Sequence, residues 1–164
     1  MKRNEENRGK GWALKSGFKA VTGDLVAFVD ADLDIHPRQL RLYLRTMEEQ
    51  KADVVIASKR HPDSVLDYPS HRKAISAIYF GLVKALFGLP IRDTQTGLKL
   101  FRYGVLDRAF HRILVKRWAF VLELLVNAHH LGYRIVDAPV RIDFHRKFGR
   151  MRFRDLYHTG LDTL

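Results

Sequence analysis

Hydrophobic and polar positions along the chain follow a helical period in some segments and a strand-like pattern in others. Apolar residues at helical spacing predict five helices, at 11–21, 40–47, 73–87, 105–114 and 120–131. Short apolar runs predict four strands, at 25–29, 53–57, 98–101 and 133–144. Pro139 interrupts the last of these, which is typical of an edge strand or a bulge. The alternation of the two kinds of element predicts an α/β sheet in one domain.

The strand predicted at 25–29 is apolar throughout, as is typical of a central strand with neighbours on both sides. Few strands are predicted before it. An open apolar edge invites pairing with another strand. We therefore expect further strands beside this one, either from a segment missing here or from a partner.

The amino-acid composition excludes several classes of function. The 164 residues are 46% hydrophobic, enough for one domain with a core, and contain no Cys, which excludes disulfides, thiolate zinc sites and cysteine nucleophiles. The longest apolar stretch, 74–90, is interrupted by Lys84 and is shorter than the ~20 residues of a membrane-spanning helix. A formal net charge of +11 indicates polyanionic partners, namely nucleic acid, anionic lipid or phosphorylated substrates, with a merely basic surface as the alternative.

Three acids, Asp30, Asp32 and Asp34, follow the strand at 25–29 in the sequence FVDADLDIHP. In extended backbone, residues two apart point to the same side, so these carboxylates would converge on one hard cation. Pro37 suits the first turn of a following helix. The acids would then lie at the carboxyl end of a strand, where open α/β sheets bind ligands.

The same three acids would also fit two other kinds of structure. A helix-loop-helix calcium site needs Gly at its sixth position and Glu at its twelfth, where this chain has Ile35 and Arg41, so that site is excluded. Three solvated acids in a turn remain the alternative. The role of Glu123 also has two alternatives, because an acid inside an apolar helix is either a surface residue or a site residue.

Six motifs occur in an order that resembles family 2 glycosyltransferases of the GT-A fold: NRGKGWALKSG, FVDADLDIHP, VVIASKRHPDS, RKAIS, DTQTGLKLF and KRWAFVLELL. The likeness is greatest to the polyprenyl-phosphate sugar transferases, the dolichyl-phosphate mannosyl- and glucosyltransferases. The DTQTG and KRW sequences favour the glucosyl-transferring branch. The resemblance implies a Rossmann-like mixed sheet flanked by helices.

The resemblance also implies an activity: transfer of a hexose from UDP-glucose or GDP-mannose to a polyprenyl phosphate, with inversion at the anomeric carbon. Mg²⁺ or Mn²⁺ would be the cofactor, held by Asp30, Asp32 and Asp34. Such an enzyme would lie peripherally at the cytoplasmic face of a membrane. Nucleic acid is not an expected partner, since no groove-reading or stacking motif is present.

Further site residues are implied motif by motif. Lys10 would lie near the nucleotide, Asp93 and Gln95 near the donor sugar or the acceptor, and Glu123 in the catalytic site. Asp93 is expected to orient a substrate rather than to remove a proton. The residues expected to bind substrate phosphates are Ser58 with Lys59 and Arg60, whose register is open between the two cations, the pair Arg72 and Ser76, and Arg146.

The chain departs from the family pattern at its beginning. Family members carry a first strand with a P-A-Y-N-E type sequence before the GKG motif, whereas here Gly9 follows Met1 by eight residues. Residues 1–164 are therefore expected to form one partial, N-terminally truncated GT-A domain. The alternative is an incomplete remnant that acts as a basic membrane- or polyanion-binding module. Val121 also stands where the family usually has Asp.

Overall fold

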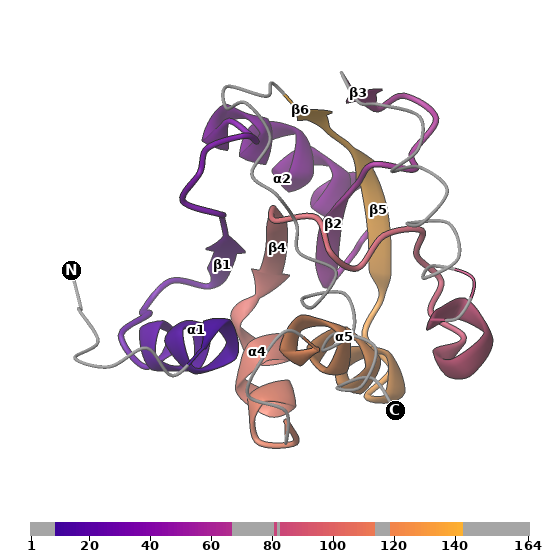
Figure 1. Ribbon diagram of the computed structural model, residues 1–164. Helices are drawn as coiled ribbons and strands as arrows, with labels where there is room; N and C mark the ends of the chain where they lie inside the picture. Colours follow the sequence, from indigo (N-terminus) through magenta and orange to yellow (C-terminus); the bar gives the residue numbers. More distant parts are fainter. Residues whose placement is uncertain (1–8, 67–80, 82, 114–118, 143–164) are drawn as a thin grey trace.

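A computed structural model describes residues 9–66, 81, 83–113 and 119–142, and its centre is a four-stranded sheet (Figure 1). The strand order is β1 (Leu25–Phe28), β4 (Lys99–Arg102), β2 (Val54–Ser58) and β5 (Ile135–Pro139). β4 runs antiparallel to both of its neighbours, whereas β2 and β5 are parallel. The mixed α/β sheet predicted from the sequence is confirmed.

Helices cover both faces of this sheet (Figure 1). On one face lie α1 (Lys10–Phe18), α4 (Tyr103–Phe110) and α5 (Phe120–His130), packed against a core that includes Val54 and Phe101. On the other face lies α2 (Leu40–Glu49), whose Tyr43 and Met47 pack against Val55. A 3-10 turn, η1 (Pro37–Gln39), leads into α2, as expected from Pro37. Alternate residues of β2 thus serve two cores, which explains why every position of β2 is buried.

The position of β1 differs from that of a central strand. Among the strands of the described residues it lies at the edge, paired with β4 alone, while β4 and β2 lie inside. Val26 and Phe28 are buried, but Leu25 and Val29 are 39% and 38% exposed. Although β1 is apolar throughout, only one of its two faces is buried by the residues that the structure describes.

The long strand expected at 133–144 is two short strands in its described part. β5 ends at Pro139, and after Val140 the chain forms β6 (Arg141–Ile142), which pairs in parallel with β3 (Val65–Leu66) in a second sheet. β5 lies at the other edge of the main sheet, so the expectation of an edge position or a break at Pro139 is confirmed. β3 is a strand that the sequence pattern did not predict.

Two predicted helix ends lie too far along the chain. α1 ends at Phe18, three residues before the expected end, because the amide of Val21 bonds the carbonyl of Phe18 in a tight turn. α4 ends at Phe110 rather than at 114, with His111 at its carboxyl end. Of the helix expected at 73–87, residues 81 and 83–87 are helical, and 73–80 and 82 lie outside the described residues.

Close packing of α1 on α5 fixes the amino end of α1. A side chain added at Gly11 would place its Cβ 2.5 Å from Cδ2 and 2.6 Å from Cγ of Phe120. Only glycine allows this approach of the two helices. The contact holds the neighbouring residue, Lys10, in the position from which its side chain reaches the end of β1.

Candidate active site

The three acids lie in a turn rather than in extended backbone. The amide of Leu33 bonds the carbonyl of Asp30 at 3.4 Å, and the amide of Asp34 bonds Oδ1 of Asp32 at 3.3 Å. Leu33 has a φ of 60°, in the left-handed region. The expectation that alternation in extended backbone aligns the three carboxylates is therefore wrong. Across the described ranges, no three acid, His or Cys side chains come together in a way that could hold a metal, so the metal set stays a prediction.

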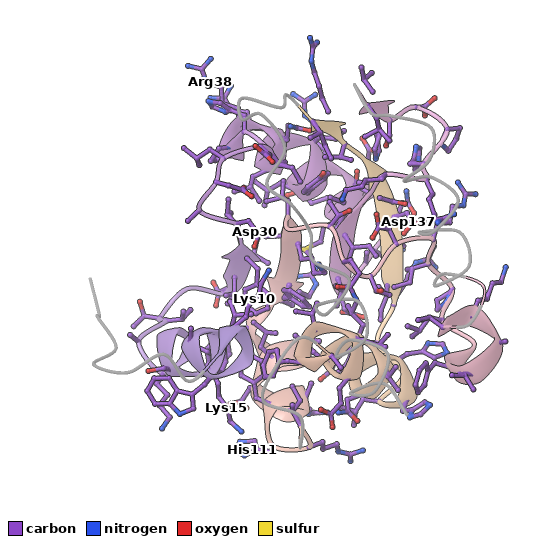
Figure 2. The ribbon with its side chains drawn as sticks, in the orientation of Figure 1. Lys10, Lys15, Asp30, Arg38, His111 and Asp137 are labelled. Atoms are coloured by element: carbon purple, nitrogen blue, oxygen red, sulfur yellow. The ribbon has the colours of Figure 1, made fainter. Side chains whose placement is uncertain are left out.

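The carboxylate of Asp30, which Figure 2 labels together with Lys10, is the meeting point of three of the motifs. Its Oδ1 accepts a hydrogen bond from Nζ of Lys10 at 2.7 Å, across the gap between α1 and β1. Its Oδ2 lies directly against Gly97, where an added Cβ would be 2.5 Å from Cγ of Asp30. The GKG, DAD and DTQTG sequences thus converge on one carboxylate, although they are far apart in the chain.

Asp93 organises the loop that carries the DTQTG sequence. Its Oδ2 accepts hydrogen bonds from the amide of Lys59 at 3.1 Å and from Oγ1 of Thr96 at 2.6 Å. Its Oδ1 accepts from the amides of Gln95 and Thr96 at 2.9 and 3.2 Å. Four donors on one carboxylate favour an orienting role over proton removal, because its lone pairs are already engaged. The catalytic role of Asp93 and Gln95 stays a prediction.

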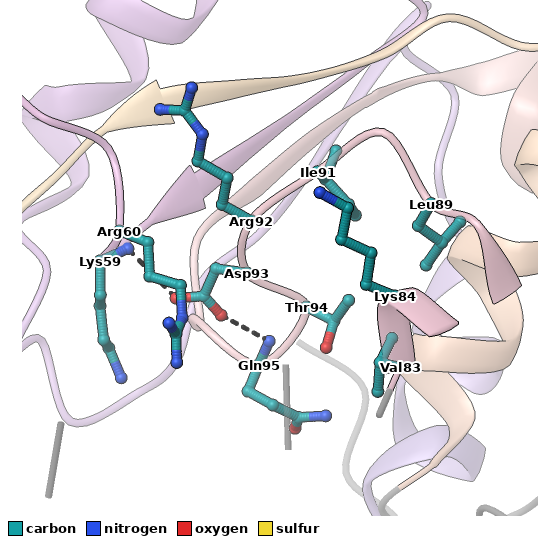
Figure 3. Close-up of a pocket in the computed structure, with 10 residues that line it drawn as sticks. All are labelled: Lys59, Arg60, Val83, Lys84, Leu89, Ile91, Arg92, Asp93, Thr94 and Gln95. Carbon is teal, nitrogen blue, oxygen red and sulfur yellow. Dashed lines mark hydrogen bonds between the residues drawn. The ribbon is translucent and has the colours of Figure 1, made fainter. Parts of the chain in front are cut away.

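A pocket opens beside this loop, with cations along it and apolar side chains at one end (Figure 3). The cations are Lys59, Arg60, Lys84 and Arg92. The remaining residues that line it are Val83, Leu89, Ile91, Asp93, Thr94 and Gln95. Sequence reasoning identified Lys59, Arg60, Asp93 and Gln95 but missed Lys84 and Arg92. A lone lysine inside an apolar stretch was the available signal for Lys84.

β5 anchors the pocket wall through Asp137. Both of its carboxylate oxygens accept hydrogen bonds from the amide of Arg92, at 3.0 and 3.3 Å. Burial raises the pKa of Asp137 to about 6, and the Arg92 hydrogen bond opposes that rise. Two neighbouring residues are thus fixed: Arg92 through the bond from its amide to Asp137, and Asp93 through the bond from the Lys59 amide to its carboxylate.

Lys99, on β4, is a buried cation that sequence reasoning missed. Its side chain is 3% exposed and donates a hydrogen bond to the carbonyl of Thr96. Burial lowers the pKa of Lys99 to about 8, while the negative charges of Asp93 and Asp30 oppose that shift. A lysine between the apolar residues of GLKLF was the available signal.

The remaining predicted site residues that the structure describes are not among those that line the pocket. Ser58 is fully buried and shapes the turn after β2, since its Oγ accepts from the amide of Arg60 at 3.3 Å and its carbonyl accepts from Oγ of Ser64 at 2.6 Å. Glu123 is half-buried on α5 and does not line the pocket. Its assignment as a site residue stays a prediction. Arg72, Ser76 and Arg146 lie outside the described residues.

None of the helices that the structure describes combines the length and apolar character needed to cross a lipid bilayer.

Solved structures confirm the fold. Glucosyl-3-phosphoglycerate synthase from Mycobacterium tuberculosis, in complex with Mn²⁺, UDP and glucosyl-3-phosphoglycerate, matches 94% of this chain with a TM-score of 0.65 and 20% identity. The same enzyme with Mg²⁺ and UDP matches 90% of the chain with a TM-score of 0.65 and 19% identity. The chain covers 51% and 49% of those two structures. The expected GT-A arrangement is therefore present.

Curated relatives and a family model agree with the resemblance seen in the sequence. The dolichyl-phosphate beta-glucosyltransferase of Drosophila melanogaster is 32% identical over 143 residues, which is 83% of this chain and 44% of the relative. Glycosyltransferase AglD of Haloferax volcanii is 30% identical over 137 residues, 84% of this chain and 22% of the relative. The chain thus spans less than half the length of these two proteins. The model of glycosyl transferase family 2 matches residues 1–110, so the chain belongs to that family.

Proposed function

We propose that this chain carries the site at which a hexose is transferred from a nucleotide-sugar to the phosphate of a dolichyl-type polyprenol. The pocket beside the DTQTG loop is the observation that carries the proposal. The named function of the Drosophila relative supports the acceptor, and the UDP complexes of the mycobacterial enzyme support the donor. UDP-glucose is the proposed donor, and GDP-mannose is the competitor to be tested beside it.

The lining of the pocket matches a phosphate joined to an apolar chain. Lys59, Arg60 and Arg92 supply positive charge near Asp93, whose four hydrogen bonds keep it engaged with the loop. Guanidinium groups bind phosphate oxygens in pairs, which fixes orientation as well as charge. Leu89 and Ile91, which are almost fully buried, form the apolar end of the same pocket. An acceptor with both characters would meet both in one place.

The reaction needs positioning more than proton transfer. The second pKa of a phosphomonoester is about 6, so the acceptor is largely dianionic at neutral pH and needs no strong base. One acceptor oxygen forms a bond to the anomeric carbon, on the face opposite the nucleotide. The bond from that carbon to the diphosphate breaks, and its electron pair leaves with the nucleoside diphosphate. The configuration at the anomeric carbon is inverted. In this proposal Lys59 and Arg60 hold the acceptor, and the family resemblance adds Arg72, Ser76 and Arg146 as further phosphate-binding residues.

The acids suit a divalent cation in this proposal. Asp30, Asp32 and Asp34 would hold Mg²⁺ or Mn²⁺, which when bound neutralises charge on the leaving diphosphate. All donors are carboxylate oxygens, and Oδ1 of Asp34 is buried without a hydrogen-bond partner among the described residues. Mg²⁺ is usually held by one or two carboxylates together with substrate phosphates. A site of this kind does not require three acids gathered before the donor binds.

The test is a transfer assay with purified protein, labelled UDP-glucose and a detergent-dispersed prenyl phosphate. We expect label in the lipid phase with Mn²⁺ or Mg²⁺, and a loss of about 100-fold or more when EDTA removes the metal, because the leaving diphosphate then lacks its counter-charge. The unphosphorylated prenol is the matched acceptor control and is expected to receive no label. Transfer at an equal rate in EDTA would contradict the metal dependence.

The same preparation separates this proposal from its alternative. A basic module that peripherally contacts the cytoplasmic face of a membrane would bind acidic liposomes through its net charge of +11 without any affinity for a nucleotide-sugar. Calorimetry with UDP-glucose and Mn²⁺, beside liposome sedimentation, decides between the two. Liposome binding with no heat of donor binding would favour the basic module.

A further inference from the structure

Lys99 lies on β4 where a packed apolar side chain would be expected. Side chains alternate along a strand, so Lys99 shares a face with Phe101 and points to the side that α1, α4 and α5 cover. Across the sheet it is paired with Phe28 of β1 and Ile56 of β2, which both belong to the same core. An ammonium buried at 3% exposure in such surroundings loses solvation. Local packing alone gives no reason for a cation here.

The charges around Lys99 come from four of the six motifs. The negative charges of Asp93 and Asp30 act on its ammonium, and the positive charges of Lys10 and Lys59 oppose them. Its one described hydrogen bond goes to the carbonyl of Thr96, within the DTQTG loop. That carbonyl is next in the chain to Gly97, against which Asp30 lies. Lys99 is therefore near the centre of the candidate site, but beneath its surface.

We propose that Lys99 is a positioning residue whose buried ammonium holds the DTQTG loop and the Asp30 carboxylate in the arrangement that the proposed sugar transfer needs. This inference rests on the proposed function. Its hydrogen bond to Thr96 fixes the loop from below, while Asp93 fixes it from the side through Lys59. The loop in turn places Gly97 directly against the Asp30 carboxylate, so a loop held by Lys99 also holds Asp30. Since Lys99 is buried, it acts through these groups and touches no substrate.

The first variant, Lys99→Met, keeps the apolar length of the side chain and removes the ammonium. We expect transfer to fall by about 100-fold, because small misplacements of reacting groups cost that much. The midpoint of thermal unfolding is expected to stay the same or rise, since a buried charge is replaced by a packed apolar chain. Transfer at the wild-type rate would overturn the inference. A wild type that transfers no hexose would instead overturn the proposed function.

The second variant separates the charge of Lys99 from its packing. The chain has no cysteine, so Lys99→Cys introduces a unique thiol. Alkylation with 2-bromoethylamine in denaturant, followed by refolding, restores an ammonium, whereas 1-bromopropane gives a neutral chain of the same length. Wild-type protein taken through the same cycle sets the reference rate. We expect recovery of transfer with the aminoethyl group only. Equal recovery with both groups would show that packing suffices and would overturn the inference.

Discussion

Asp32→Asn is expected to lower the rate of hexose transfer by about a thousandfold, because a carboxylate that neutralises the metal and, through it, the leaving diphosphate acts on the charge of the transition state. Asp32 is exposed in the turn after β1, and Asn fits there without changing shape or packing. The thermal unfolding midpoint should therefore change little. The measurement is the initial rate of label transfer at a series of Mn²⁺ concentrations.

The matched control for this variant is Asp107→Asn. Asp107 is an exposed acid on α4, so the substitution removes the same charge from the chain at a position away from the site. The control is expected to transfer hexose at the wild-type rate with the same dependence on Mn²⁺. If Asp32→Asn did the same, the acid turn would not be the metal site.

Gly97→Ala is expected to lower transfer by about 100-fold while leaving the fold intact. The added methyl group would occupy the position of the Asp30 carboxylate, which must then turn away from Lys10. A side chain can move in this way at little cost in stability, but a displaced site residue costs catalysis heavily. The rate of transfer and the thermal unfolding midpoint, measured on the same preparation, check the two halves of this prediction.

Gly104→Ala is the control for the methyl group itself. Gly104 lies in α4 with no atom within 4 Å of an added Cβ among those that the structure describes. Alanine there is expected to preserve transfer and to raise stability slightly, because it favours the helix. Full activity of Gly97→Ala would show that the contact between Gly97 and Asp30 has no role in the reaction.

The order of helices and strands was predictable because buried faces impose their periods on the sequence. β2 and α2 were found within a few residues of their observed bounds for this reason. The apolar residues of β1 did not by themselves indicate an edge position, because hydrophobicity reports burial and not the number of neighbouring strands. The small number of strands predicted before it did indicate an open edge. β3 consists of two residues, too few to show a period.

The candidate site was predictable only where its residues are close together in the sequence and form a motif. The acids and the DTQTG loop were recognised as motifs. Their arrangement was not, because Leu33 adopts a left-handed φ that a leucine rarely takes, and this converts an expected extended segment into a turn. Arg92 was missed since it joins the pocket through its bond to Asp137, a contact across 45 residues. Lys99 was missed because composition does not reveal that a lysine is buried.

The identity and anomeric form of the lipid product test the central claim most directly. Protein incubated with UDP-glucose, Mn²⁺ and a short prenyl phosphate would be followed by proton and phosphorus NMR of the extracted lipid. We expect glucose joined through its anomeric carbon to the prenyl phosphate, in the configuration opposite to that in the donor. Free glucose without a glucosyl phosphate, or a product that retains the donor configuration, would contradict the account.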